Sequence, residues 1–402
     1  MSVFDLVDIN GIVYSYLGYK DQLNFLSTSK QIYMSSKSFR YLRLGFVSSE
    51  EFYNVNSFRD RMLSLINHSN IQMSLKFNKK SIFQRIDQIG MSILGSVHTL
   101  TFDNCSDIVD VSSLGSIHTL ILRECENIVD VTALSNVHKM VLFECPRITD
   151  ISGLRSVHTL NVGECPGIVD VSALGSVYSL CFDSCHGIVD VSALESVHTL
   201  SFLSCDGVVD VSALRSVHKL TFFGCYGIVD VSALGYVHTL TLCNCGIVDV
   251  SALGTVHTLT LDCCSGIVDV SALGSVHTLS FNRCGGLVDV SALGSVYCLR
   301  FQYCCNIVDV TALCTVHTLT LVECRRIIDI TALGSVHTLT LNDCRNIIDV
   351  SALCTVHTLS IHNCRGIVDV SALGTVHTLT LTRCPRIIDR SVLKSVKILR
   401  FD

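Results

Sequence analysis

The sequence predicts a repeat solenoid, in which about sixteen short parallel strands are joined by 3-10 or extended returns and preceded by a small helical domain. Cysteines recur almost every twenty residues from Cys105 to Cys384, each within the motif V-H-T-L-T-L-x-x-C-x-x-I-V-D-V-S-A-L-G-S. A fixed period of twenty or more residues is the signature of a solenoid. Twenty residues leave no room for a full α-helix between strands, so the return is expected to be a 3-10 turn or an extended segment.

The first 45 residues are expected to form the helical domain. Apolar residues recur at helical spacing through a first helix, and a second helix follows Lys20-Asp21. The apolar set is Leu6, Ile9, Ile12, Val13, Tyr16, Leu17 and Leu23.

This segment resembles an F-box. The matching residues are Tyr16-Leu17, Asp21, Leu23, Leu26, Thr28-Ser29-Lys30 and Tyr33, whereas Val7 replaces the family's usual proline. The resemblance implies that the apolar set docks a Skp-type adaptor of a cullin ubiquitin ligase. The alternative is a plain helical cap on the solenoid.

Residues 46–95 are expected to form a helical linker and the N-terminal cap of the array. Residues 57–68 favour an amphipathic helix, residues 71–77 a degenerate first strand, and residues 81–93 a covering helix. An array needs atypical terminal repeats to cover its end.

Residues 96–402 form the repeat array. In the repeat 137–156, Val137, Met140 and Leu142 follow the spacing L-x-x-L-x-L, and the last two alternate with other residues as in a strand with one buried face. With Cys145 three residues later, the repeat resembles the leucine-rich repeat. The resemblance implies a horseshoe or arc, with strands beginning at Val97 and at the equivalent position of each later repeat.

Three residue types recur in fixed positions. The cysteines show no C-x-x-C pair and one thiol per coil, so we expect buried packing, no metal site and no cofactor. The aspartates from Asp110 to Asp389 are expected to accept backbone N–H groups at the start of each return. The histidines from His98 to His377 are either a packed row of rings or a pH sensor, and the sequence leaves both open.

Positions that vary between near-identical coils are expected to carry specificity. Those that we expect to bind a partner on the concave strand face or its rim are Arg123, Glu124, Phe143, Glu144, Phe223, Arg283, Arg300, Gln302, Tyr303, Glu323, Asp343 and Arg383. Arginine and tyrosine are common hot-spot residues, so Arg300 with Tyr303 is the first patch to test. The alternative is that this variable surface is simply unconstrained.

Composition and charge narrow the function classes. Residues 101–280 carry 6 Lys/Arg against 19 Asp/Glu, whereas residues 281–402 carry 12 against 9. This two-signed surface argues against nucleic-acid binding, which favours one basic face, and suits a protein partner. No apolar run is long enough for a membrane helix and no secretory signal is evident, so we expect a cytoplasmic protein with free thiols.

The expected function is therefore substrate recognition, with the array holding an unknown target protein and the front segment docking the adaptor. No catalytic arrangement stands out, so no enzyme activity is expected; a histidine- and cysteine-rich metal enzyme is the least favoured class. The alternative is a leucine-rich-repeat scaffold unrelated to ubiquitin. Near-identical coils behind an F-box-like segment also resemble repeat proteins of large DNA viruses of amoebae, which implies host cytoplasm. The last strand, near Val396, is expected to leave an open edge that leads either to self-association or to a fragile last coil.

Overall fold

The structure is a computed structural model that describes residues 41–44, 46–57, 59–60, 63, 72–78, 92–389 and 391–401. The whole apolar set of the F-box-like segment, Leu6, Ile9, Ile12, Val13, Tyr16, Leu17 and Leu23, lies outside these residues. Most residues of the two helices expected at 57–68 and 81–93 also lie outside the described ranges. The chain divides into two compact units, Met1–Gly187 (unit 1) and Ile188–Asp402 (unit 2).

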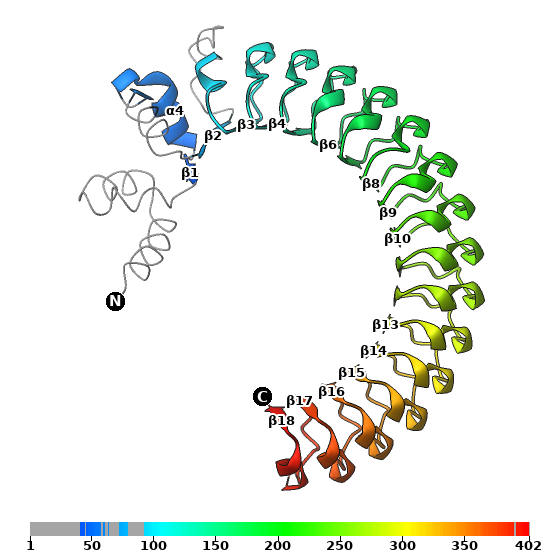
Figure 1. Cartoon of the computed structure of the whole chain (residues 1–402). Helices are drawn as coiled ribbons and strands as arrows, with labels where there is room; N and C mark the ends of the chain where they lie inside the picture. The colour runs from blue at the N-terminus through cyan, green and yellow to red at the C-terminus, as the bar shows by residue number, and fades with distance from the viewer. Residues whose placement is uncertain are drawn as a thin grey trace. The chain divides into compact units, whose positions relative to one another are not determined.

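Unit 1 is a stack of parallel strands joined by 3-10 helices (Figure 1). Its strands are β1 (Tyr41–Arg43), β2 (Gln72–Asn78), β3 (Thr99–Asp103), β4 (Thr119–Arg123), β5 (Lys139–Phe143), β6 (Thr159–Gly163) and β7 (Ser179–Asp183). Its helices are α4 (Phe46–Asn54), η2 (Ser112–Leu114), η3 (Thr132–Leu134), η4 (Ser152–Ser156) and η5 (Ser172–Ser176). Each strand pairs in parallel with the next along the chain, from β1 to β7.

Unit 2 repeats the same coil. Its strands are β8 (Thr199–Leu203), β9 (Lys219–Phe223), β10 (Thr239–Cys243), β11 (Thr258–Asp262), β12 (Thr278–Asn282), β13 (Cys298–Gln302), β14 (Thr318–Val322), β15 (Thr338–Asn342), β16 (Thr358–His362), β17 (Thr378–Thr382) and β18 (Ile398–Phe401). Its 3-10 helices are η6 (Ser192–Leu194), η7 (Ser212–Ser216), η8 (Ser232–Tyr236), η9 (Ser251–Thr255), η10 (Ser271–Ser275), η11 (Ser291–Ser295), η12 (Thr311–Thr315), η13 (Thr331–Ser335), η14 (Ser351–Thr355), η15 (Ser371–Thr375) and η16 (Ser391–Ser395). Every strand from β8 to β18 pairs in parallel with its successor.

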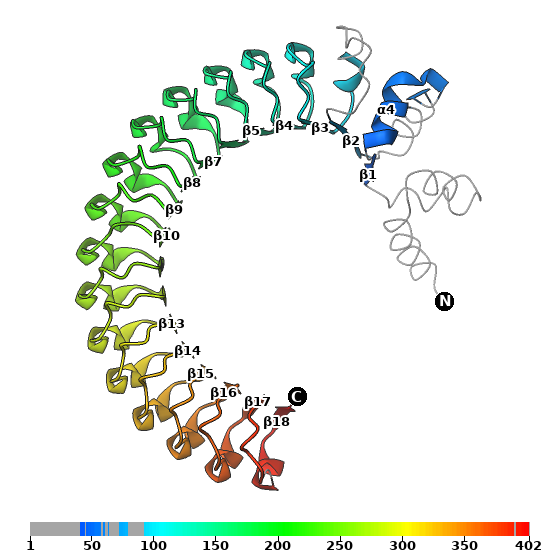
Figure 2. The ribbon, with the colours of Figure 1, turned by 180° about the vertical axis from the view of Figure 1, so that it is seen from behind.

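The register of the strands places equivalent residues of neighbouring coils side by side. Each position of the repeat therefore forms a row of residues along its unit. Leu259 of β11 lies opposite Leu279 of β12, for example, and Asp262 opposite Asn282. In each unit the strands follow one side of the coils and the 3-10 helices follow the other (Figure 2). The sixteen expected strands correspond to β3 to β18, which confirms the predicted solenoid with 3-10 returns.

Seven residues of each coil form the core. In the first regular coil they are Val97, Leu100, Phe102, Cys105, Ile108, Val111 and Leu114, all at most 3% exposed. Core phenylalanines stack between neighbouring coils, as Phe281 does on Phe301 with 5.4 Å between ring centroids. The buried thiols are therefore part of the hydrophobic packing that joins successive coils.

The strands begin two residues later than the sequence predicts. The valine that was expected to open each strand instead closes the preceding 3-10 helix, because its N–H donates to the leucine carbonyl three residues earlier. Val256, for instance, donates to Leu253 at 3.1 Å. Extended strand pairing starts only at Thr258.

The N-terminal elements also differ from expectation. Within residues 1–45, assigned to the helical domain, Tyr41–Arg43 form a strand that pairs with β2. The expected degenerate strand is present as β2, whose Met73, Leu75 and Phe77 are buried. The Ser49 hydroxyl of α4 accepts the N–H of Lys76 at 2.9 Å, which fastens this helix to β2.

Each return opens on a fixed aspartate. The Asp269 Oδ1 atom accepts the N–H of Ser271 at 2.8 Å, and all fifteen aspartates of this row make the equivalent bond at 2.8–2.9 Å. This local turn lowers the pKa of the Asp269 carboxyl, because the backbone and side chain of Ser271 both hydrogen-bond the charged form. The predicted structural role of the aspartates is confirmed.

Candidate partner-binding site

The twelve predicted partner-binding residues fall in two places. Arg123, Phe143, Phe223, Arg300 and Gln302 lie on the outward face of strands. The other seven occupy the position just before the repeat cysteine; they are Glu124, Glu144, Arg283, Tyr303, Glu323, Asp343 and Arg383.

The position just before the repeat cysteine has an unusual backbone conformation. Its residues have a positive φ in almost every coil, such as 54° at Tyr303 and 64° at Gly224. Their N–H groups extend the sheet ladder by one bond, as when Tyr303 N–H donates to the Val322 carbonyl at 2.9 Å. Left-handed backbone is strained for residues other than glycine, so this turn fixes the direction of each side chain at the rim of the strand face.

In unit 1 the rim carries an acidic row. Glu124, Glu144 and Glu164 occupy equivalent positions of successive coils. Desolvation and then the charges of Glu164 and Glu124 raise the pKa of Glu144. The Arg123 guanidinium lies 6.0 Å from the centroid of the Phe143 ring, next to this row.

In unit 2 the face of β11–β13 brings together four of the predicted polar residues. Arg300 Nη2 donates to Gln302 Oε1 at 2.8 Å, within β13. The Arg283 guanidinium lies 5.5 Å from the centroid of the Tyr303 ring, close enough for a cation–π contact. Four of the twelve predicted residues thus share one patch.

Two buried side-chain oxygens lie at the same place. Asp262 Oδ1 and Asn282 Oδ1 are buried atoms with no hydrogen-bond partner in the described part of the chain. Their residues are neighbours in register, and Gln302 follows in the same row. Both oxygens are shielded from solvent, so the groups of this patch that a partner can reach are the exposed Arg283 and Arg300 and the half-buried Tyr303.

A thiol completes the polar edge of this patch. Burial, followed by the charge of Asp262, raises the pKa of Cys243 to about 12. The thiol is therefore protonated at neutral pH and is no nucleophile. The patch, which we call the β11–β13 site, combines acceptors, two guanidinium groups and a tyrosine ring, which is recognition chemistry.

Two further predicted residues, Glu323 and Asp343, are neutralised by arginines of their own coils. Arg325 pairs with Glu323 at 2.7 Å, and Arg345 pairs with Asp343 at 2.6 Å. Asp343 is only 8% exposed, so it supports its neighbours more than it meets solvent. No group of three or more His, Cys, Asp or Glu side chains suited to a metal ion occurs among the residues that the structure describes.

Sequence reasoning missed Asp262 as a residue of this patch. Asp262 and Asn282 occupy the variable last position of their strands, and this variation was a signal that could have been used. The burial of one oxygen of each side chain cannot be derived from the sequence pattern.

Within the described ranges, no helix is long and apolar enough to span a bilayer.

Comparison with solved structures places the fold. A leucine-rich-repeat protein of Leptospira interrogans matches with a TM-score of 0.51 and 14% identity, over 92% of this chain and 97% of that chain. An internalin of Listeria monocytogenes (InlF) matches with a TM-score of 0.46 and 20% identity, over 68% and 82%. The functional domain of internalin InlJ from the same organism, which includes a cysteine ladder, matches with a TM-score of 0.36 and 18% identity, over 77% and 73%. No protein-family model and no curated protein matches the sequence. The first likeness, together with the coils described above, shows a leucine-rich-repeat fold.

Proposed function

We propose that this chain is a protein-binding scaffold that holds a partner at the β11–β13 site and performs no chemistry itself. The carrying observation is the cluster of Arg283, Arg300, Gln302 and Tyr303, which is held together by the Arg300–Gln302 hydrogen bond and the Arg283–Tyr303 contact. A regular parallel sheet presents these side chains, and arginine and tyrosine are residue types that often dominate the binding energy of protein interfaces.

The chemistry of the site favours a particular kind of contact. A carboxylate of the partner suits Arg300, whose guanidinium can bind such a group through two parallel hydrogen bonds. Tyr303 offers flat apolar area in the same patch. Asp262 within the patch disfavours a phosphate backbone, so a protein segment fits better than nucleic acid.

A more specific part of the proposal concerns the F-box-like segment at the N-terminus. Docking of a Skp-type adaptor by the F-box-like segment is supported by sequence resemblance alone, since those residues lie outside the described part. The cytoplasmic setting and the role as a ubiquitin-ligase subunit belong to this same part. A leucine-rich-repeat scaffold unrelated to ubiquitin is the alternative.

The site is tested by restoring it to the repeat consensus. Threonine occupies the position of Arg300 in β11 and β14, so Arg300→Thr removes the guanidinium with little disturbance of the coil. Proteins captured by the full chain are compared with those captured by Arg300→Thr and by the control Thr320→Ser. We expect a specific protein that the wild type and the control retain and the variant loses at least tenfold. Equal retention by all three proteins contradicts the proposed site.

The adaptor proposal needs a separate experiment. Purified full-length chain is mixed with a Skp-type adaptor, and complex formation is measured by pull-down and size exclusion. We expect retention that Leu17→Asp abolishes and Arg300→Thr leaves unchanged. A wild-type chain that retains no adaptor contradicts the ubiquitin-ligase role and leaves the array's own binding to be judged by the first experiment.

A further inference from the structure

A ridge of exposed aliphatic side chains runs along unit 2 on the return segment of the coils. Six of its eleven coils read Ile-Val-Asp-Val and the others read a variant of it; the first residue is buried, the second faces outward, and the fourth is buried as far as Val370. The ridge consists of Val189, Val209, Val229, Val248, Val268, Val288, Val308, Ile328, Ile348, Val368 and Ile388, each 44–89% exposed. Single exposed aliphatic residues are ordinary, but an unbroken row of them marks an interaction surface.

A row of carboxylates follows the ridge one residue later. Asp249 and Asp269 are exposed, and each uses Oδ1 to accept the N–H of the serine two residues on. Neither forms an ion pair with a cationic side chain of the described residues. Hydrogen bonds from the serines lower the pKa of both carboxyls, so the row stays charged at neutral pH.

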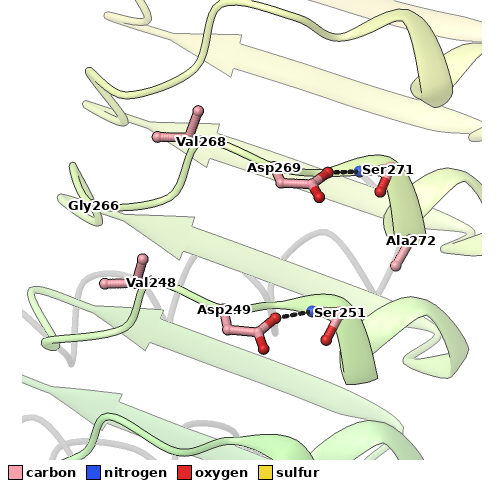
Figure 3. A pocket seen from close by; sticks show the side chains of 8 residues that line it. All are labelled: Val248, Asp249, Ser251, Gly266, Val268, Asp269, Ser271 and Ala272. Carbon is pink, nitrogen blue, oxygen red and sulfur yellow. Dashed lines mark hydrogen bonds between the residues drawn. The ribbon is translucent and has the colours of Figure 1, made fainter.

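Between two coils the ridge opens into a pocket of about 450 Å³ (Figure 3). Val248 and Val268 lie along one side, Ala272 lies on the other, and Asp249 and Asp269 lie between them. The pocket belongs wholly to unit 2. Its walls are therefore aliphatic and its floor is anionic.

The pocket coincides with the one irregular repeat. The coil that contains Cys245 has nineteen residues, because a single Gly246 replaces the usual two-residue turn. In the next coil the turn residue is Gly266, where a Cβ atom would come within 3.2 Å of Val248. The shortened turn and the missing side chain leave the space between the two valines open.

We propose that this pocket docks lysine or arginine side chains of a protein partner, with their aliphatic stems against Val248 and Val268 and their charged ends at Asp249 and Asp269. Long basic side chains bury an apolar stem while keeping the charge in a polar setting, which matches the layered lining. The charge row disfavours a second copy of the same face and an anionic membrane, because both would bring like charges together. The surface lies on the return segment, apart from the β11–β13 site, and does not depend on it.

Two double variants measure separately what the apolar walls and the charges of the pocket contribute to binding. Asp249→Asn with Asp269→Asn removes both charges, while asparagine retains an oxygen that can accept the serine N–H. Val248→Thr with Val268→Thr removes apolar surface with a residue that Thr149 already provides at the equivalent position. The control is Asp349→Asn with Asp369→Asn, which removes the same charge from a regular part of the same row.

The probe is a fluorescein-labelled hexalysine peptide, measured by fluorescence anisotropy against the full chain at physiological salt. We expect the Asp249/Asp269 variant to lose at least tenfold in affinity, the Val248/Val268 variant at least threefold, and the control less than twofold. A hexapeptide of 2,4-diaminobutyrate, which keeps the charge on a shorter stem, should bind at least threefold more weakly. Carbodiimide coupling of the bound peptide should join it mainly to Asp249 and Asp269, as mapped by mass spectrometry.

Other occupants give other results. Equal losses in the variant and the control, or coupling spread evenly along the row, would show general attraction to the carboxylates and overturn the pocket. Absence of peptide binding also overturns it. Sedimentation with phosphatidylcholine vesicles, or a dimer, that only Val248→Thr with Val268→Thr abolishes would assign the ridge to lipid or to a second copy. Arg300→Thr should leave hexalysine binding unchanged, so failure here is distinct from failure of the proposed function.

Discussion

The imidazole ring of His257 stacks on that of His277, with 4.7 Å between ring centroids and 13° between ring planes. The same contact recurs along unit 2 and, separately, along unit 1, with centroid separations of 4.3–4.9 Å. Tyr297 takes part in the stack between His277 and His317, so an uncharged ring fits the row. The imidazoles stack as aromatic rings, and protonating neighbouring rings would place like charges at contact distance.

Acid should therefore weaken the array. Desolvation first, and then the charge of a neighbouring histidine, lower the pKa of His98, His118, His238 and His357; Lys397 adds to the effect at His357. The unfolded chain then binds protons before the folded one, so stability is full above about pH 6.5 and falls below it. We expect the melting temperature to fall steadily from pH 7.5 to pH 5, measured by circular dichroism.

The control replaces stacked histidines with the residue that the row already accepts. His238→Tyr, His257→Tyr and His277→Tyr together keep the stack and remove three proton sites. This variant should show a smaller drop in melting temperature over the same pH range. A wild-type melt that does not change between these pH values contradicts the prediction.

The left-handed turn before each cysteine makes a second prediction. Gly224 has φ of 64°, and a Cβ added there would meet Ser204 Oγ no closer than 3.4 Å. Gly224→Ala should therefore cost about 1 kcal/mol through backbone strain alone, without a clash. Gly224→Asn should cost less, because asparagine tolerates this conformation and occupies the same position at Asn244. Urea unfolding measures the free energies.

A glycine outside the left-handed region serves as the comparison. A Cβ at Gly285 would meet nothing within 4 Å, and its φ is not positive. Gly285→Ala should change stability by less than about 0.5 kcal/mol, as at ordinary surface positions. Equal costs at the two glycines would contradict a strained turn.

Periodicity was enough to predict the coil but not its fine geometry. The alternation of Leu259 and Leu261 with polar residues predicts a strand, and twenty residues per repeat predict a 3-10 return. Val256 was placed at the start of the strand because apolar residues look alike in a pattern. Its N–H closes the preceding turn instead, and a sequence pattern carries no record of which carbonyl a given N–H meets.

The two proposed surfaces differ in how visible they are in the sequence. Arg300 and Tyr303 stand out because they break the repeat, whereas Val248 and Val268 repeat faithfully and therefore resemble core residues. Only the path of the return shows that the second residue of Ile-Val-Asp-Val faces outward. The unpaired oxygen of Asp262 depends on side-chain positions in three neighbouring strands, which no single repeat encodes.

The cysteine thiols should react at different rates according to how deeply they are buried. Cys305 is exposed, whereas the row cysteines are buried, and burial raises the pKa of Cys284 to about 12. Thiolate is the reactive form, so Cys305 should react first with a disulfide reagent at pH 8. The row cysteines should react only after unfolding in guanidinium. Cys305→Ser should remove the fast phase, and rapid labelling of Cys284 in the native protein would contradict the packing described here.

Asp343 lies at the centre of a cluster of arginines, and its negative charge should lower the affinity of that cluster for anions. Arg345 binds it with two hydrogen bonds, from Nε to Oδ1 at 2.6 Å and from Nη2 to Oδ2 at 3.0 Å. The Arg345 hydrogen bonds, followed by the charges of Arg345, Arg325 and Arg365, lower the pKa of this carboxyl. Asp343→Asn should remove the ion-pair partner of Arg345 and one of the carboxylates that offset Arg325 and Arg365. The protein should then elute from a heparin column at higher salt and lose about 0.5–1 kcal/mol of stability. Asp289→Asn removes the same charge from the return segment and should shift elution less; equal shifts would show that only net charge matters.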